Sequence, residues 1–341
     1  MNDLISVVIL NYNGIKYLRD CFSSLQEQTY PNFEIIMIDN NSSDESVAFV
    51  KTEFPKILII ENKLNKGFAE GNNIGVRNAK GRYIALLNND TIVNATWLSE
   101  LYAALHETKN PLVGSFIHTK YGDRICDGQD GTINLTGYYI GGIFSKPTKT
   151  FFASGCSMLF DKNVIGLPFD PDYFFYSEDV YLSWLTRLRG YNVSQAPASI
   201  VEHIGSASTN KVKAFMRTFY QERNRLLNLL IFYSPATLLK LIPYLVFDAL
   251  FRPLYIAANP GKSLRGWLKA NIWLLTNSSP ILKKRKFVQS KRKCIDQIVI
   301  ENMSCRIANG KNIIVQAVNR LSFIYCLISG IKTIEISRRK T

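Results

Sequence analysis

Short apolar runs alternate with segments of helical periodicity over residues 1–90 of this 341-residue chain. Apolar runs that end abruptly at turn residues are typical of strands buried on both faces of a parallel sheet. Strands are predicted at residues 6–10, 34–38, 57–60 and 83–87, with helices at 15–28, 45–54 and 68–79 between them. This alternation predicts an α/β fold with a doubly wound, mostly parallel central sheet.

Polar residues follow three of these predicted strands at the point where each strand ends. Asn11 follows the first strand, Asp39 the second, and Asn88, Asn89 and Asp90 the fourth. Right-handed crossovers place the carboxyl ends of parallel strands on one edge of the sheet, where open α/β sheets bind ligands. One such cluster would be explained as a turn, but three on one edge predict a binding site. The Asp90 carboxylate suits Mg²⁺ or Mn²⁺ shared with a substrate phosphate.

A stretch rich in glycine and asparagine, N-K-G-F-A-E-G-N-N-I-G, covers residues 65–75. It resembles a loop that cradles phosphate, but its spacing matches neither G-x-G-x-x-G nor the P-loop pattern. A Rossmann dehydrogenase and a P-loop NTPase are therefore disfavoured. Gly71 and Gly75 lie one helical turn apart and would permit close packing of the helix on a strand. Asn72 and Asn73 beside them are interpreted as ligand contacts.

The segments between residues 96 and 202 show weaker patterns. A helix is predicted at residues 96–108 and strands at 151–160 and 199–202, whereas residues 118–150 have no clear periodicity. An irregular segment of that length is usually a substrate loop or a partly mobile one.

Two adjacent carboxylates, Glu178 and Asp179, lie among aromatic residues in F-F-Y-S-E-D-V-Y-L. They fit the first turn of a helix that runs to about residue 189, where carboxylates suit the helix dipole. That structural explanation is adequate locally. The functional alternative is that the pair supplies a general base beside rings able to stack on a sugar. His203, in E-H-I-G-S-A-S, is a lone histidine, which is more often structural than a ligand, but the small residues around it favour an exposed site.

The order of these segments resembles the family 2 glycosyltransferases of the GT-A fold, and most closely the branch that builds bacterial and archaeal surface polysaccharides, including rhamnosyltransferases. The resemblance spans roughly residues 5–225. It implies a nucleotide-diphosphate-sugar donor, a divalent metal (Mg²⁺ or Mn²⁺) and inversion at the anomeric carbon. The matching segments are S-V-V-I-L-N-Y-N-G, I-D-N-N-S-S-D, N-K-G-F-A-E-G-N-N-I-G, L-L-N-N-D-T-I-V, A-S-G-C-S-M-L-F, F-F-Y-S-E-D-V-Y-L, E-H-I-G-S-A-S and F-Y-Q-E-R-N-R.

The resemblance also implies a role for individual residues. Asp179 would be the base that deprotonates the acceptor hydroxyl, with Glu178 supporting it, and Asp90 would ligate the metal, with His203 completing the coordination. The arginines of R-N-R would neutralise the leaving diphosphate. The residues expected to bind the donor nucleotide are Asn11, Asp39, Asn41, Gly67, Asn72, Asn73, Asn88, Asn89, Arg223 and Arg225.

The sequence departs from the family pattern at two places. Asn88 replaces the first Asp of the usual D-x-D motif; its neutral amide still accepts a hydrogen bond from a ribose hydroxyl, but metal affinity is expected to be lower. Tyr181 replaces the second Asp of E-D-V-D-L, which affects only local hydrogen bonding.

The last third of the chain is strongly basic. Residues 207–341 contain 24 Lys and Arg against 5 Asp and Glu, whereas residues 1–206 contain 17 against 22. Apolar segments interrupted by basic residues and proline suit helices that lie in a membrane interface, and the polybasic runs at 283–286 and 291–293 suit anionic lipid. No run of eighteen uncharged apolar residues predicts a spanning helix. The alternative is a solvated basic helical appendage with a role such as oligomerisation. Nucleic acid is disfavoured because no binding motif accompanies the charge.

Together these patterns predict a GT-A catalytic domain at residues 1–225 and a basic, amphipathic, membrane-associated helical region at 226–341. The expected activity is that of a hexosyltransferase moving a sugar from dTDP-rhamnose or a UDP-hexose to a lipid-linked glycan at the cytoplasmic face of the membrane. The six cysteines lack metal-like spacing and the N-terminus lacks a signal-peptide pattern, which favours a reducing compartment. The alternatives are a sugar nucleotidyltransferase and a non-catalytic scaffold that binds a sugar nucleotide.

Overall fold

The computed structural model describes residues 3–121, 124–127, 131–141, 150–204, 212–310 and 313–337. The chain divides into two compact units. The first comprises Met1–Gln129, Phe152–Thr186 and Asn192–Lys211, and the second comprises Asp130–Phe151, Arg187–Tyr191 and Val212–Thr341. The chain therefore passes between the two units several times.

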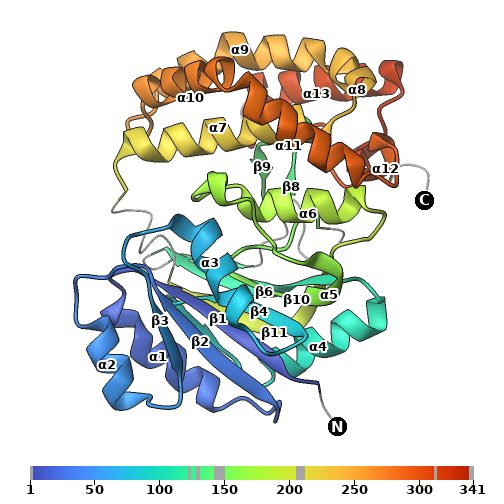
Figure 1. Ribbon diagram of the computed structural model, residues 1–341. Coiled ribbons are helices and arrows are strands. Elements are labelled where there is room, and N and C mark those ends of the chain that lie inside the picture. The colour runs from blue at the N-terminus through green and yellow to red at the C-terminus, as the bar shows by residue number, and fades with distance from the viewer. Residues whose placement is uncertain are drawn as a thin grey trace. The chain divides into compact units, whose positions relative to one another are not determined.

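The first unit is built on a sheet which, within the described residues, has nine strands in the order β3-β2-β1-β4-β10-β6-β11-β5, with β7 paired to β6 (Figure 1). The first four strands are parallel, β10 is antiparallel to both of its neighbours, and β11 is parallel to β6. The strands are β1 Ile5–Asn11, β2 Phe33–Asp39, β3 Leu58–Glu61, β4 Tyr83–Asn88, β5 Thr91–Val93, β6 Leu112–Tyr121, β7 Arg124–Asp127, β10 Ser157–Asp161 and β11 Ser194–His203. This sheet confirms the predicted α/β class.

Helices cover both faces of this sheet, as its buried apolar strands require. The helices are α1 Ile15–Gln26, α2 Ser46–Glu53, α3 Gly67–Asn78, α4 Trp97–Thr108, α5 Lys162–Ile165 and α6 Glu178–Leu188. One core cluster joins Val7 and Ile9 of β1 to residues of α1, α2 and α4. On the opposite face α3 packs so closely that a Cβ on Gly75 would lie 2.2 Å from Cγ1 of Val8. The packing role predicted for the α3 glycines is confirmed.

The strands that the sequence does not predict are stabilised by distant partners. β6 spans Leu112–Tyr121, where no strand was predicted, and the indole nitrogen of Trp97 donates hydrogen bonds to Ser115 of β6 (3.0 Å) and Ser157 of β10 (2.9 Å). Both serines are buried. Their hydroxyls are acceptable in the core because these bonds satisfy them, which no local pattern reveals. The prediction that residues 118–150 are irregular is wrong where they form β6 to β9; residues 122–123, 128–130 and 142–149 lie outside the described part.

The second unit is helical and carries one small hairpin, which confirms the predicted helical C-terminal region. The hairpin strands are β8 Thr132–Ile133 and β9 Tyr139–Ile140; the helices are α7 Ala214–Phe232, α8 Pro235–Lys240, α9 Ile242–Ala257, α10 Leu264–Thr276, α11 Ser278–Ser290, α12 Asp296–Ile300, α13 Ile313–Ser329 and α14 Ile334–Ser337 (Figure 1). Among the helices described, none has the length and apolar character needed to cross a membrane.

The hairpin is tied to the C-terminal residues. Thr132 Oγ1 donates to the carbonyl of Asn302 (2.6 Å), and the amide of Ser304 donates to the carbonyl of Ile133 (2.9 Å). The hydroxyl of Tyr233 donates to the carbonyl of Leu135 (3.1 Å). Residues from the middle of the chain are therefore structural parts of the C-terminal unit.

Three helices of the second unit expose apolar residues at helical spacing. In α9 and α10 these residues recur every three or four positions, so they form one stripe along each helix. We call these residues, with those of α13, the apolar stripes: Ile242, Val246, Leu250 and Leu254 of α9; Leu264, Leu268, Ile272 and Leu275 of α10; and Ile314, Leu321 and Ile328 of α13.

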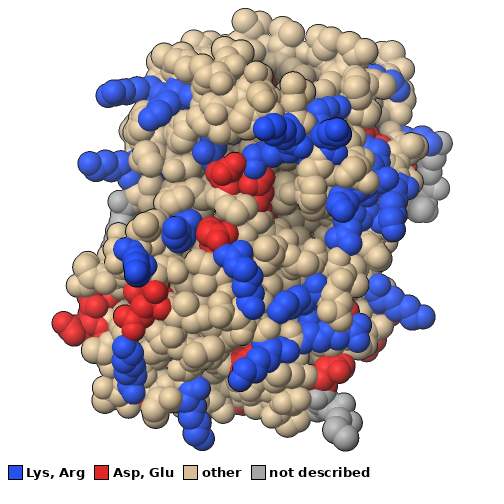
Figure 2. Space-filling view, viewed as in Figure 1, with Lys and Arg blue, Asp and Glu red and all other residues tan. Residues whose placement is uncertain are grey.

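Lys and Arg side chains are spread over the face drawn in Figure 2, with smaller groups of Asp and Glu between them.

Candidate active site

The ends of β1, β2 and β4 meet in one hydrogen-bonded cluster. Asn11 Nδ2 donates to Asp39 Oδ1 (3.1 Å), and Asn89 Nδ2 donates to Asn11 Oδ1 (2.7 Å). The second carboxylate oxygen of Asp39 accepts from the amide of Ser42 (2.9 Å). Asn11 and Asp39 are buried. The prediction that these strand ends lie on one edge of the sheet is confirmed.

Gly14 makes this cluster possible, and the sequence reasoning missed it. A Cβ at this position would lie 2.2 Å from Asn89 Nδ2 and 2.4 Å from Asn11 Oδ1. Those separations are far shorter than any real contact, so every larger residue would displace one of the two amides. The signal was present in N-Y-N-G, where a glycine follows three residues after the strand end.

Asn41 and Asn88 flank the cluster. Asn41 is exposed and has a φ of 67°, a left-handed conformation that asparagine tolerates better than most residues. Asn88 is the last residue of β4; its amide donates to the carbonyl of Cys156 (2.9 Å), and its own carbonyl accepts from Thr91 Oγ1 (2.6 Å). These bonds fix the turn that leads to Asp90.

Gly67, Asn72 and Asn73 lie in the first two turns of α3. Gly67 has a φ of 77°, and the amides of the next two residues donate to the carbonyl of Phe174 (2.5 and 3.1 Å). Asn73 is 0% exposed and exchanges hydrogen bonds with the backbone of Phe169, donating at 2.8 Å and accepting at 3.2 Å. Asn72 donates to a carbonyl one turn earlier in the helix (2.9 Å). These contacts hold the loop before α6. That the three residues contact the donor nucleotide stays a prediction.

Asp90 and His203 face each other across neighbouring segments. The Nε2 atom of His203 lies 3.3 Å from Asp90 Oδ1, and β11 brings them together because His203 pairs with Thr91 of β5. Both side chains are largely buried. Asp90 Oδ1 and His203 Nδ1 have no hydrogen-bond partner within the described structure. A buried polar atom without a partner is unfavourable unless something binds it.

This pair has the chemistry of a partial metal site. Carboxylate oxygen and imidazole nitrogen are both ligands of Mn²⁺-type cations, and the bare Oδ1 of Asp90 is an available donor atom. Within the described residues no group of three or more His, Cys, Asp or Glu is arranged to hold a metal ion. The described residues therefore offer two ligands here, and substrate oxygens and water would supply others, as is usual for Mg²⁺ bound with phosphates.

Glu178 and Asp179 begin α6 directly after an unusual turn. Phe174, Tyr176 and Ser177 have φ values of 60°, 70° and 62°, in the left-handed region that residues other than glycine rarely adopt. Such strain accumulates at functional sites because the surroundings must hold it in place. No residue pattern predicts this turn, since none of the three is a glycine or an asparagine.

The two carboxylates differ in their contacts. Asp179 accepts from the amides of Gly155 (Oδ2, 3.2 Å) and Val180 (Oδ1, 2.8 Å), whereas Glu178 Oε2 is buried without a hydrogen-bond partner in the described structure. Burial raises the pKa of Asp179, although these amides oppose the rise. Burial also raises the pKa of Glu178 well above its usual range, and the neighbouring Asp179 charge adds to it. Asp179 is therefore the residue of the pair that ionises more readily, and its raised pKa makes it a stronger base than an exposed carboxylate.

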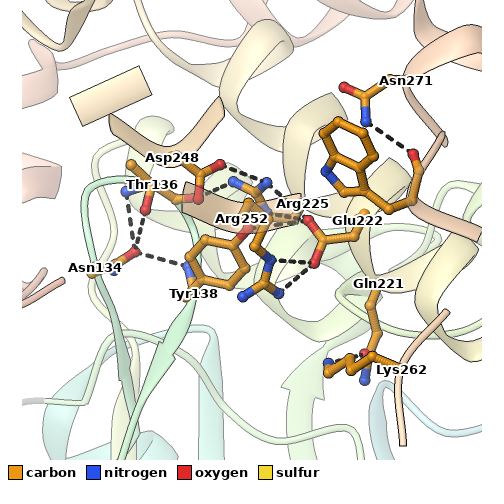
Figure 3. A network of polar contacts seen from close by, with 11 residues as sticks. Asn134, Thr136, Tyr138, Gln221, Glu222, Arg225, Asp248, Arg252, Lys262 and Asn271 are labelled. Atoms are coloured by element: carbon orange, nitrogen blue, oxygen red, sulfur yellow. Dashed lines mark hydrogen bonds and ion pairs between the residues drawn. The ribbon is translucent and has the colours of Figure 1, made fainter. Parts of the chain in front are cut away.

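Arg223 and Arg225 lie in α7 of the second unit. The Arg225 guanidinium binds Glu222 Oε2 and Asp248 Oδ2, both at 2.9 Å, and is stacked 4.0 Å from the Tyr138 ring (Figure 3). The Arg223 guanidinium lies over aromatic rings of α7 and α10. The charge of Arg225 is thus balanced inside this unit, and the role of both arginines at a diphosphate stays a prediction.

Known proteins resemble this chain in sequence and in fold. Residues 6–166 match the model of glycosyl transferase family 2. The chain is 36% identical over 111 residues to "Glycosyltransferase GlyG" of Streptococcus pneumoniae serotype 4, a match covering 31% of this chain and only 36% of GlyG. It is 26% identical over 228 residues to WfaP of Escherichia coli, described as a UDP-Glc:alpha-D-GlcNAc-diphosphoundecaprenol beta-1,3-glucosyltransferase, covering 63% of this chain and 84% of WfaP. The crystal structure of GalNAc-T7 with UDP, GalNAc and Mn2+ shares the fold, with a TM-score of 0.61 at 16% identity over 87% of this chain and 56% of that one.

Proposed function

Because the chain belongs to glycosyl transferase family 2, we propose that it is an inverting, metal-dependent enzyme that transfers a sugar from a nucleotide-diphosphate donor to a lipid-linked glycan. The observation that carries this proposal is the buried Asp90–His203 pair beside the strand-end cluster, in which Asp90 Oδ1 and His203 Nδ1 have no hydrogen-bond partner among the described residues. A structural ion pair would not leave these atoms unsatisfied, whereas a substrate-bound cation would use them.

The proposed division of work follows from the contacts of each residue. Asp39 and Asn11 would hold the nucleoside, with Asn41, Asn88 and Asn89 beside them at the same edge. Asp179 would accept the proton of the acceptor hydroxyl, since its raised pKa suits a general base. When bound, a divalent cation at Asp90 and His203 would supply positive charge for the leaving diphosphate.

A UDP-hexose is the donor that we propose first, ahead of dTDP-rhamnose. WfaP, which this chain covers over most of its length, is described as using UDP-Glc and a diphosphoundecaprenol acceptor. By analogy the acceptor here would be a glycan carried on a polyprenyl diphosphate, in the assembly of a cell-surface polysaccharide.

We further propose that the second unit binds an anionic membrane surface at the cytoplasmic face. The apolar stripes give three helices an exposed face suited to the membrane interface. Residues 207–341 contain 24 basic and 5 acidic residues, and this positive charge would attract anionic headgroups. This arrangement would hold the enzyme next to an acceptor whose lipid part is in the bilayer.

Donor binding and turnover test the proposal. Binding and hydrolysis of a panel of UDP- and dTDP-sugars would be measured with Mn²⁺, with Mg²⁺ and with EDTA, using wild type, Asp90→Ala and the exposed control Asp20→Ala. One donor should bind in a metal-dependent way, and only Asp90→Ala should lose it. Binding without any transfer, unchanged in Asp179→Asn, would favour a scaffold, and release of diphosphate from a nucleoside triphosphate would favour a nucleotidyltransferase. The anomeric configuration of the product by NMR decides between inversion and retention.

A further inference from the structure

The second unit contains a partly open cavity of about 330 Å³ lined by residues of α7, α8, α9 and α10. Nine of its twelve lining residues are apolar, and seven of these are leucines that come from all four helices. The others are Arg225, Asp248 and Asn271. A cavity with this lining favours an apolar occupant.

The three polar residues are already satisfied. Arg225 and Asp248 pair with each other at 2.9 Å, and Asn271 Nδ2 donates to the carbonyl of Trp267 (2.9 Å), as drawn in Figure 3. A sugar or nucleotide would need polar groups that converge on it, and these residues use theirs on each other. An apolar ligand can occupy the cavity without breaking any of these bonds.

The rim of the cavity is continuous with the apolar stripes. Leu275 both lines the cavity and belongs to the stripe of α10, where it is 80% exposed, and Leu230 on α7 is 39% exposed. An apolar chain that leaves the cavity would therefore meet the face proposed above to contact the membrane. In size, the cavity is roughly twice the ~150 Å³ that holds one benzene ring, which corresponds to about two isoprene units.

We propose that this cavity binds the proximal isoprene units of the polyprenyl chain of the lipid-linked acceptor. The inference rests on the proposed function, which supplies the class of acceptor; apart from Arg225, the cavity lining contains none of the residues predicted to bind the donor nucleotide. It assigns the second unit a task beyond adhesion to the membrane: selecting acceptors by their lipid. Short alkyl acceptors would bind weakly because they leave the leucine lining unfilled.

Photo-crosslinking tests this inference directly. The full chain would be irradiated with farnesyl phosphate carrying a diazirine on its hydrocarbon part, and the labelled peptides would be mapped by mass spectrometry. Labels are expected on the lining residues of α9 and α10, with competition by undecaprenyl phosphate and none by inorganic phosphate. Labels spread evenly over the apolar stripes would overturn the inference, because they would indicate only partition onto an apolar surface.

A matched pair of variants sharpens the test. Ala249→Trp fills the cavity, whereas Ala257→Trp adds the same ring to an exposed position of the same helix outside the lining. Labelling should fall about tenfold or more in Ala249→Trp. Keeping only two methylene groups of the lipid out of the cavity would already weaken its binding by roughly that factor. It should stay at the wild-type level in Ala257→Trp, with thermal melting confirming that both variants fold. Equal labelling of the two variants would refute the proposal.

Two parallel measurements separate the possible failures. If a UDP-sugar binds but the cavity is not labelled, the cavity inference fails while the proposed function stands. If no sugar nucleotide binds, the proposed function itself fails. Sedimentation of wild type and Ala249→Trp shows whether a second copy of the chain fills the cavity. If the wild type is a dimer and the variant is not, the occupant is the second copy and the proposal of a lipid occupant is overturned.

Discussion

Replacing Glu222 by glutamine removes the central negative charge of the buried network in Figure 3. The side chain is 1% exposed. Its Oε2 atom accepts from Nε and Nη2 of Arg225 (3.2 and 2.9 Å) and from the hydroxyl of Tyr138 (3.0 Å). Its Oε1 atom accepts from Nε of Arg252 (2.9 Å) and from the Nη2 atom of the same residue. Glutamine keeps the shape, but it turns one acceptor into a donor that faces a guanidinium and leaves two buried cations with less compensation.

We expect this change to lower the free energy of unfolding of the second unit by about 3–5 kcal/mol, the usual effect of removing one partner of a buried ion pair. The effect should also depend on pH. Burial alone would raise the pKa of Glu222, but the charges of Arg225 and Arg252 outweigh it and lower the pKa overall. The unfolded chain therefore binds this proton more tightly than the folded one, so the stabilisation is present above the ordinary carboxyl pKa of 4.5 and is lost as the pH falls through the lowered one.

Urea unfolding followed by tryptophan fluorescence would measure the difference, at pH 7 and at several lower values. Trp267 and Trp273 report on the second unit. Glu301→Gln is the matched control because Glu301 is exposed in the same unit. The gap between wild type and Glu222→Gln should be largest near neutral pH and should shrink on acidification. A change of less than about 0.5 kcal/mol at pH 7, as expected for an ordinary surface substitution, would refute the reasoning.

Three further predictions concern the candidate active site. Asp179→Asn should lower kcat about 10²–10⁴-fold while the donor dissociation constant, measured by calorimetry, stays the same; a large loss of donor affinity would contradict the role as acceptor base. In the wild type, kcat/KM should fall as the pH drops through the raised pKa of Asp179. The apparent pKa of the acidic limb of the pH–rate profile should therefore lie above the pKa of ~3.9 of an exposed Asp. An apparent pKa at or below that value would exclude this carboxylate as the base. Gly14→Ala should destabilise the first unit by about 1–3 kcal/mol and weaken donor binding because its Cβ would overlap Asn89, whereas Gly261→Ala, whose Cβ has ordinary contacts, should do neither in the same melting and binding assays.

Local signals account for the part of the fold that the sequence predicted. The first four strands end within about two residues of their predicted positions because each apolar run is short and ends in turn residues. β6 was missed because Ser115 looks polar until the indole of Trp97 is known to bind it, whereas β10 lies within the strand predicted at 151–160 apart from its last residue. Tertiary hydrogen bonds override the local pattern there.

In the candidate site, too, one part could be predicted from the sequence and another part could not. The cluster of Asn11, Asp39 and Asn89 follows from strand order alone, since parallel crossovers bring those ends together. The left-handed turn before Glu178 could not be predicted, because its conformation is imposed by the α3 amides that bind the carbonyl of Phe174 rather than by glycine. The partners of Arg225 were hidden for a related reason: Asp248 lies 23 residues away on a separate helix.

The hairpin of the second unit has a consequence for biosynthesis. Thr132 is bonded to Asn302, 170 residues further along the chain. At a translation rate of about 5–20 residues per second, the hairpin would leave the ribosome roughly 10–30 s before its partner is made. During that time the hairpin segment can meet partners of the α7 region such as Tyr233, but it lacks its bonds to Asn302 and Ser304. The first unit can assemble its four parallel strands early, whereas the hairpin of the second unit is completed only when translation is nearly finished.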